Sequence, residues 1–184
     1  FEPEKGDPGP PPVRDREHIL GLPDLDQARR REVRAANELI LRTVALCLAC
    51  FDAGGEFLIE NPADRGDRGV SHFMDERHAP LWLFPAVDRL RSVTSGELIT
   101  FPQCALGADF QKYTTFLCSS AFAAQLRSLT NLRCTHASHK QVGGQRRGDA
   151  FTSGDSAAYP ADLNLLLAQC CATMVSRIET PPPI

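Results

Sequence analysis

The sequence predicts an α/β fold in which three short strands and four helices share most of the chain. Apolar residues recur at every third or fourth position over residues 26–51, and short apolar runs of strand length appear further along. Gly and Pro mark the boundaries between these segments. Of the 184 residues, 42% are hydrophobic and 23% are charged, which fits one folded domain and excludes disorder throughout the chain.

The chain is predicted to begin with a Pro-rich extended linker over residues 1–24. The α/β domain is predicted over residues 25–178, and a tail over 179–184. The amphipathic helix over residues 26–51 ends before the pair Gly54–Gly55, because glycine favours the conformation that closes a helix. A short apolar run follows at once and predicts a buried strand over residues 57–60.

The remaining elements follow from apolar spacing and from turn residues. They are predicted, in order, as a helix over 85–93, strands over 98–101 and 113–118, a helix over 121–129, an irregular stretch over 131–157 and a helix over 160–178 that begins at Pro160. The link over residues 107–112 is too short for a parallel crossover, so the two strands that flank it are predicted to pair antiparallel.

Charge, hydropathy and cysteine content indicate which partners and which cellular compartment to expect for the chain. A net charge of -3 leaves no overall basic footprint for nucleic acid, so a polyanion would have to be bound locally. No apolar run approaches the ~18 residues that span a bilayer, and we expect no membrane partner. Several of the seven cysteines lie among apolar helical residues, where cysteine behaves as a small buried hydrophobe. We therefore expect an intracellular, reducing compartment, either nucleus or cytoplasm.

Polar residues follow the first predicted strand. Glu60-Asn61-Pro62 places a carboxylate and an amide at its end, and a polar loop with Arg65 and Arg68 comes next. A Glu carboxylate accepts hydrogen bonds from amino groups, so it can bind the edge of a nucleobase. The alternative is an Asn-Pro turn with a solvated Glu60 and solvated arginines.

Three segments, taken in order, resemble the later motifs of DNA cytosine-5 methyltransferases. They are Glu60-Asn61-Pro62, then Leu106-Gly107 with Gln111-Lys112, and finally Ala158-Tyr159-Pro160. The closer resemblance is to methyltransferase-like domains carried by retroelement polyproteins, and it covers about residues 10 to 172.

This resemblance implies the carboxyl-terminal half of a Rossmann-like methyltransferase sheet, with flanking helices and with the strand over residues 113–118 central and antiparallel to its neighbours. It also implies a site for the target base and a cofactor, S-adenosylmethionine. The roles that it implies are catalytic for Glu60 and Asn61, substrate-binding for Arg65, Arg68, Gln111 and Lys112, and cofactor-binding for Tyr159 and Pro160.

The chain departs from that family at two essential features. A Pro-Cys nucleophile and the cofactor glycines precede Glu-Asn in the family, and neither occurs here. We therefore expect no methyl transfer by this chain alone, and an upstream half of the same domain as its partner. The alternative is a non-catalytic module of a mobile-element polyprotein that binds DNA or protein.

A separate cluster predicts a metal site. Cys134, His136 and His139 place one thiol and two imidazoles within six residues, and Cys104 could supply a fourth ligand from the neighbouring strand region. Two sulfur and two imidazole ligands suit Zn²⁺. The alternative is a buried Cys134 beside two solvated histidines.

Overall fold

The computed structural model describes residues 11–140, 146–147, 150–151 and 158–179. Its centre is a three-stranded sheet in the order β1-β3-β2, and β3 pairs antiparallel with both neighbours. The strands are β1 (Leu58–Pro62), β2 (Glu97–Pro102) and β3 (Tyr113–Cys118). The prediction of one sheet with a central, antiparallel third strand is confirmed.

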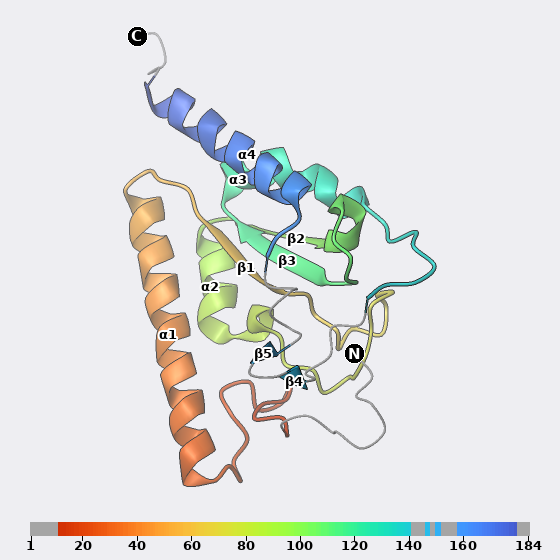
Figure 1. The fold of residues 1–184 in the computed structure, drawn as a ribbon. Coiled ribbons are helices and arrows are strands. Elements are labelled where there is room, and N and C mark those ends of the chain that lie inside the picture. Colours follow the sequence, from red (N-terminus) through yellow and green to blue (C-terminus); the bar gives the residue numbers. More distant parts are fainter. Residues whose placement is uncertain (1–10, 141–145, 148–149, 152–157, 180–184) are drawn as a thin grey trace.

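Helices cover both faces of this sheet, so the fold has three layers (Figure 1). On one face lie α1 (Gln27–Asp52) and α2 (Pro85–Val93), and on the other lie α3 (Ser120–Leu126) and α4 (Ala161–Glu179). Short 3-10 helices connect these elements: η1 (Leu81–Leu83), η2 (Gln103–Leu106) and η3 (Arg127–Asn131).

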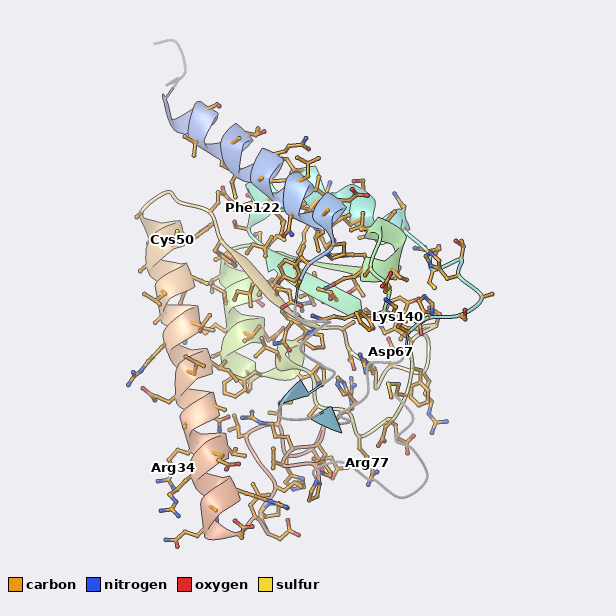
Figure 2. The ribbon with its side chains drawn as sticks, viewed as in Figure 1. Arg34, Cys50, Asp67, Arg77, Phe122 and Lys140 are labelled. Carbon is orange, nitrogen blue, oxygen red and sulfur yellow. The ribbon has the colours of Figure 1, made fainter. Side chains whose placement is uncertain are left out.

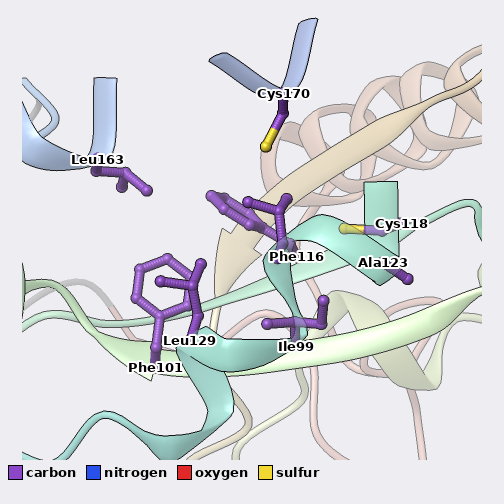
Figure 3. Close-up of a cluster of buried hydrophobic side chains, with 9 residues drawn as sticks. Ile99, Phe101, Phe116, Cys118, Ala123, Leu129, Leu163 and Cys170 are labelled. Atoms are coloured by element: carbon purple, nitrogen blue, oxygen red, sulfur yellow. The ribbon is translucent and has the colours of Figure 1, made fainter. Parts of the chain in front are cut away.

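Each face of the sheet packs its own apolar core, because alternate residues of a strand point to opposite sides. Leu163 and Cys170 of α4 lie against the aromatic pair Phe101 and Phe116, whose ring centroids are 5.1 Å apart (Figure 3). The second core lies under α1 and α2, and its buried members are Val44, Phe57, Trp82, Phe84, Val87, Leu90 and Leu117.

Polar caps set the helix ends. The Asp26 carboxylate accepts the N–H of Arg29 at 2.9 Å and begins α1, which ends before Gly54 with a positive φ of 78°. The carboxylate of Glu56 accepts the hydroxyl of Ser119 and, at 3.3 Å, the N–H of Ala121. Glu56 thereby satisfies a free N–H group at the start of α3 from a neighbouring segment.

Three elements differ from the prediction in detail. The first strand is an edge strand with half-buried side chains rather than a fully buried one, and it continues through Pro62. The helix after β3 is α-helical only to Leu126 and then tightens into η3. Pro160 precedes α4, and its carbonyl accepts the N–H of Asn164 at 3.0 Å, so it caps the helix instead of lying in its first turn.

The outer segments are described in part. Residues 11–24 contain no helix or strand and are held to the domain by side chains such as Arg14, which donates to the carbonyl of Val33 on α1 at 3.5 Å. Within the stretch predicted as irregular, Arg146–Arg147 (β4) pairs antiparallel with Ala150–Phe151 (β5). The described part leaves out residues 1–10 of the predicted linker, residues 180–184 of the tail, and residues 141–145, 148–149 and 152–157. None of the helices described is long and apolar enough to cross a membrane.

The buried core makes one substitution pair informative. Leu117 is 0% exposed at the centre of β3, whereas Leu46 on α1 is 72% exposed. Leu117→Ala is expected to lower the free energy of unfolding by about 2–5 kcal/mol, because it leaves a cavity, while Leu46→Ala changes it by less than about 0.5 kcal/mol. Urea unfolding of both variants measures the difference. Equal losses would contradict the arrangement of the core.

Candidate functional site

The candidate functional residues gather at one end of the sheet, where β1 and β2 end and β3 begins. Three loops meet there: residues 63–80 after β1, residues 103–112 between β2 and β3, and residues 132–140 after η3. Figure 2 shows Asp67 and Lys140, from the first and last of these loops, at this same end of the molecule.

The predicted metal ligands meet in space. Cys104, Cys134, His136 and His139 each offer one ligand atom, and these four atoms all lie within 4.8 Å of one another. The thiol Sγ of Cys134 lies 3.3 Å from Nε2 of His139 and 4.0 Å from Nδ1 of His136. Ligand atoms of a tetrahedral Zn²⁺ site are separated by roughly 3.3–3.8 Å, as follows from its bond lengths. A small contraction of the cluster would therefore complete such a site.

The two thiols of this cluster differ in environment. Cys104 lies in η2 and is 2% exposed, and burial together with the nearby Cys134 raises the pKa of its thiol to about 11. Burial also opposes ionisation of Cys134, but hydrogen bonds from the backbone and the ring of His136 outweigh it and lower the pKa of that thiol. Cys134 is thus the thiol that the surroundings favour as a thiolate, the form that binds metal.

The loop that carries three of the ligands is attached to the loop that carries the fourth. The N–H of Lys140 donates to the carbonyl of Asp109 at 3.0 Å, and the side chains of the same two residues form an ion pair. Phe110 and Lys140 also form an isolated parallel bridge. The amide of Gln111 lies 3.8 Å from Sγ of Cys134. These backbone and side-chain contacts hold the two loops of the cluster together.

A second cluster lies nearby on the α3/α4 face of the sheet. Oε1 of Glu60 is 3.9 Å from Nζ of Lys112, and each of these two side chains is about one quarter exposed, at 24% and 25%. The same Nζ lies 6.0 Å from the ring centroid of Tyr159. Burial raises the pKa of the Tyr159 hydroxyl to about 12, with further contributions from the charge of Glu60 and a hydrogen bond to it. Glu60 Oε1 is buried and has no hydrogen-bond partner among the described residues.

The other predicted site residues have surroundings of their own. Asn61 continues strand β1 and points to the opposite face of the sheet, because successive strand residues alternate. Arg68 forms an ion pair with Glu76 and lies 5.9 Å from the ring centroid of Phe73. Arg65 is partly buried, which lowers the pKa of its guanidinium, and it contacts the sulfur of Met74 at 3.2 Å. Pro160 is buried at the start of α4.

The structure also shows an ion pair that sequence reasoning missed. Arg16 donates three hydrogen bonds to Asp64, at 2.8 Å from Nη1 to Oδ1, 3.0 Å from Nη1 to Oδ2 and 3.1 Å from Nη2 to Oδ2. His78 lies 3.6 Å from the same carboxylate, and the N–H of Gly66 donates to it at 2.8 Å. A side chain on Gly66 would meet Arg16 Nη1 at 2.4 Å. The ion pair therefore fixes the loop after β1 against residues 11–24, and the distance in sequence left no local signal for it.

Comparison with protein families, curated proteins and solved structures finds no match to this chain. What the site can bind is therefore inferred from the residues that form it. They form a four-residue cluster of thiols and imidazoles, and next to it a half-buried carboxylate whose Oε1 faces Lys112 and accepts no hydrogen bond from the described residues.

The Arg16–Asp64 pair predicts a pH dependence of stability. Burial opposes ionisation of Asp64, but hydrogen bonds from Arg16 and Gly66 outweigh it and lower the pKa of the carboxyl below its ordinary value. The ionised form therefore stabilises the fold above the unfolded pKa of about 4, and that contribution is lost as the pH falls through the folded value. Asp64→Asn is expected to lower the melting temperature at pH 7, with a difference from the wild type that shrinks toward pH 3.

Thermal melts across this pH range measure the effect, and Asp24→Asn, at an exposed position, is the control. A deficit of the Asp64→Asn variant that stays constant down to pH 3 would show that the carboxylate charge is not the stabilising feature.

Proposed function

We propose that this chain is the nucleobase-holding half of a cytosine-5 methyltransferase-like domain, with zinc as a structural cofactor. The observation that carries the proposal is the meeting of Glu60, Lys112 and Tyr159 at one end of the sheet. Each residue comes from a different one of the three segments that resemble that family. Residues scattered over a chain by chance have no reason to converge around one carboxylate.

The chemistry of Glu60 favours an amino-bearing ligand. Its buried Oε1 accepts no hydrogen bond from the described residues, so its capacity to accept one is unused. The exocyclic amino group of cytosine is a donor that carboxylates bind through the base edge. The same Oε1 lies 3.9 Å from Nζ of Lys112, so a cation stands beside the oxygen that would accept from this amino group.

The methyl-transfer chemistry would come from outside these residues. S-adenosylmethionine would supply the methyl group when bound, held in part by Tyr159 and Pro160 together with an upstream half of the domain. Cys104 is not the nucleophile in this proposal, because its thiol is buried with a pKa of about 11 and it belongs to the metal cluster. A thiol that is protonated at neutral pH is a poor nucleophile.

A non-catalytic nucleic-acid-binding module is the second candidate, and the pairing of the loop arginines bears on it. Arg68 and Arg77 are each paired with an acidic neighbour, so the loop after β1 presents little free positive charge to phosphates. Both functions would then rely on the base edge at Glu60 rather than on the phosphate backbone. Methyl transfer by a complex with the upstream half separates them.

The donor set of the cluster favours zinc. Two thiols and two imidazoles match structural Cys₂His₂ coordination, in which four protein ligands leave no open position for a substrate. We therefore assign the metal a structural role, which is to join residues 132–140 to the loop between β2 and β3. The partial burial of the ligands, with Cys104 buried and His136 exposed, leaves a path for the ion to enter.

Zinc binding gives the first prediction for this site. Protein purified without a His tag is expected to hold about one zinc per chain, and Cys134→Ala or His139→Ala to abolish binding. Cys171→Ser, at an exposed thiol outside the cluster, is the control. A chelator should lower the melting temperature by about 10 °C, since a ligand at ~1,000 times its Kd contributes about 4 kcal/mol. Less than about a tenth of a zinc per chain with unchanged melting would contradict the assignment.

Nucleobase binding is tested with single-stranded DNA at fixed salt. Glu60→Gln is expected to weaken binding of a cytosine-rich oligonucleotide by about 10- to 100-fold, because a hydrogen bond to a charged group contributes roughly 1.5–3 kcal/mol. A thymine oligonucleotide, which lacks the amino donor, should be bound more weakly by the wild type. Fluorescence anisotropy measures both affinities.

Glu38→Gln, at an exposed carboxylate paired with Arg42 on α1, is the matched control. Equal affinities for the Glu60 and Glu38 variants, or no preference for cytosine, would rule out the proposed base contact. With labelled S-adenosylmethionine and the same oligonucleotide, the chain alone should incorporate no methyl groups, since the sequence contains no Pro-Cys pair to supply the nucleophile.

A further inference from the structure

The loop between β2 and β3 supplies one residue to each of two clusters. The first is the metal cluster of Cys104, Cys134, His136 and His139, and the second is the cluster of Glu60, Lys112 and Tyr159. Cys104, near its start, is a metal ligand, and Lys112, at its end, faces Glu60. The two ends of the loop are joined, because the N–H of Gln103 donates to the carbonyl of Lys112 at 2.9 Å. Gln103 is itself 1% exposed and donates to the hydroxyl of Thr114 at 2.7 Å. The start of the loop is therefore anchored in the sheet.

The second half of the loop depends on the metal-binding segment. Asp109 accepts a backbone hydrogen bond from Lys140, and the amide of Gln111 contacts Sγ of Cys134. Both partners belong to residues 132–140, which contain three of the four ligands and have no helix or strand of their own. A metal ion would join this segment to Cys104, and so would close residues 109–111 into a fixed position.

Lys112 follows Gln111 directly and receives its position from the same loop. Its N–H donates to the carbonyl of Phe110 at 3.1 Å, and its carbonyl accepts from Gln103. Its side chain then extends to Glu60 and to the ring of Tyr159. The path from the metal cluster to Glu60 thus runs through adjacent residues of one short loop, with a hydrogen bond or a side-chain contact at each step.

We propose that metal binding at Cys104, Cys134, His136 and His139 positions Lys112 against Glu60, and thereby makes nucleobase binding metal-dependent. This inference rests on the proposed function, from which it takes the nucleobase as the ligand. With the metal bound, the loop is ordered before the base arrives, so binding carries a smaller entropic cost. Coupling of this kind is reciprocal, and the base must tighten metal binding by the same factor.

The first test follows Lys112 itself and needs no nucleobase. The chain has three lysines, Lys5, Lys112 and Lys140, so mass spectrometry can follow acetylation of each one separately. Removing zinc with a chelator is expected to raise the acetylation rate of Lys112 by about fivefold or more, the lower end of typical coupling. Circular dichroism, recorded in parallel, reports whether the fold persists. An unchanged rate at Lys112 in chain shown to have lost its zinc would overturn the proposal.

The second test keeps the metal ligands and removes a contact between the metal cluster and the loop that carries Lys112. Gln111→Ala leaves all four ligands in place and removes the contact with Cys134. Loaded with zinc, this variant is expected to show faster acetylation of Lys112 and about fivefold weaker binding of the cytosine oligonucleotide. Gln125→Ala, on α3 away from the cluster, is the matched control. Wild-type behaviour of the zinc-loaded Gln111→Ala variant in both assays would overturn the coupling, even where chelated wild-type protein unfolds.

The two proposals fail in different ways. If the wild type binds no cytosine oligonucleotide but Lys112 still responds to zinc, the proposed function is wrong and the positioning of Lys112 stands. If the oligonucleotide binds through Glu60 with an affinity that zinc does not change, the function stands and the metal dependence is wrong. The Lys112→Met variant tests the last step, which is the contact of Lys112 with Glu60. The affinity of this variant for the oligonucleotide should no longer depend on zinc.

Discussion

The rest of the structure depends on the double pairing of strand β3. This strand is hydrogen-bonded to β1 on one side and to β2 on the other, and every residue from Thr114 to Cys118 is buried. Phe116 enters one core and Leu117 the other, so the single strand holds both layers of helices to the sheet. A slip of one residue would exchange these faces and expose apolar side chains, which makes the register strongly determined.

That register also positions the candidate sites. Pro62 of β1 lies opposite Thr114 of β3, so Glu60 and the residue that precedes β3, Lys112, are brought to the same end of the sheet. The same strand start fixes the loop that carries Cys104. The metal cluster and the cluster around Glu60 therefore both depend on the loop between β2 and β3, which returns the chain from an edge strand to the central strand.

The elements with regular apolar spacing could be predicted from the sequence, and their packing explains why. Helix α1 and the strands around β3 bury the residues that the spacing selects, such as Val44 and Phe116. The metal cluster could also be predicted, because Cys134, His136 and His139 are close in sequence and need only one distant partner. Local patterns suffice where the interacting residues are neighbours or recur with the period of a helix or strand.

Pairings between distant polar residues could not be predicted in this way. Arg16 and Asp64 are remote in sequence, and nothing near either residue marks the other. The resemblance implies catalytic roles for both Glu60 and Asn61, and the strand that contains them directs the two side chains to opposite faces of the sheet. The resemblance implies substrate binding by Arg68, and the structure places this side chain in an ion pair with Glu76. In each case the outcome depends on the tertiary arrangement of a loop or a strand end.

The most direct measurement is a crystal structure of the zinc-loaded chain with a bound cytosine oligonucleotide. The account predicts one zinc ion among Cys104, Cys134, His136 and His139, with sulfur at ~2.3 Å and nitrogen at ~2.0–2.1 Å. It also predicts the cytosine amino group at ~2.9 Å from the Glu60 carboxylate, with Lys112 still alongside. A base bound elsewhere, with Glu60 facing only Lys112 and Tyr159, would contradict the account.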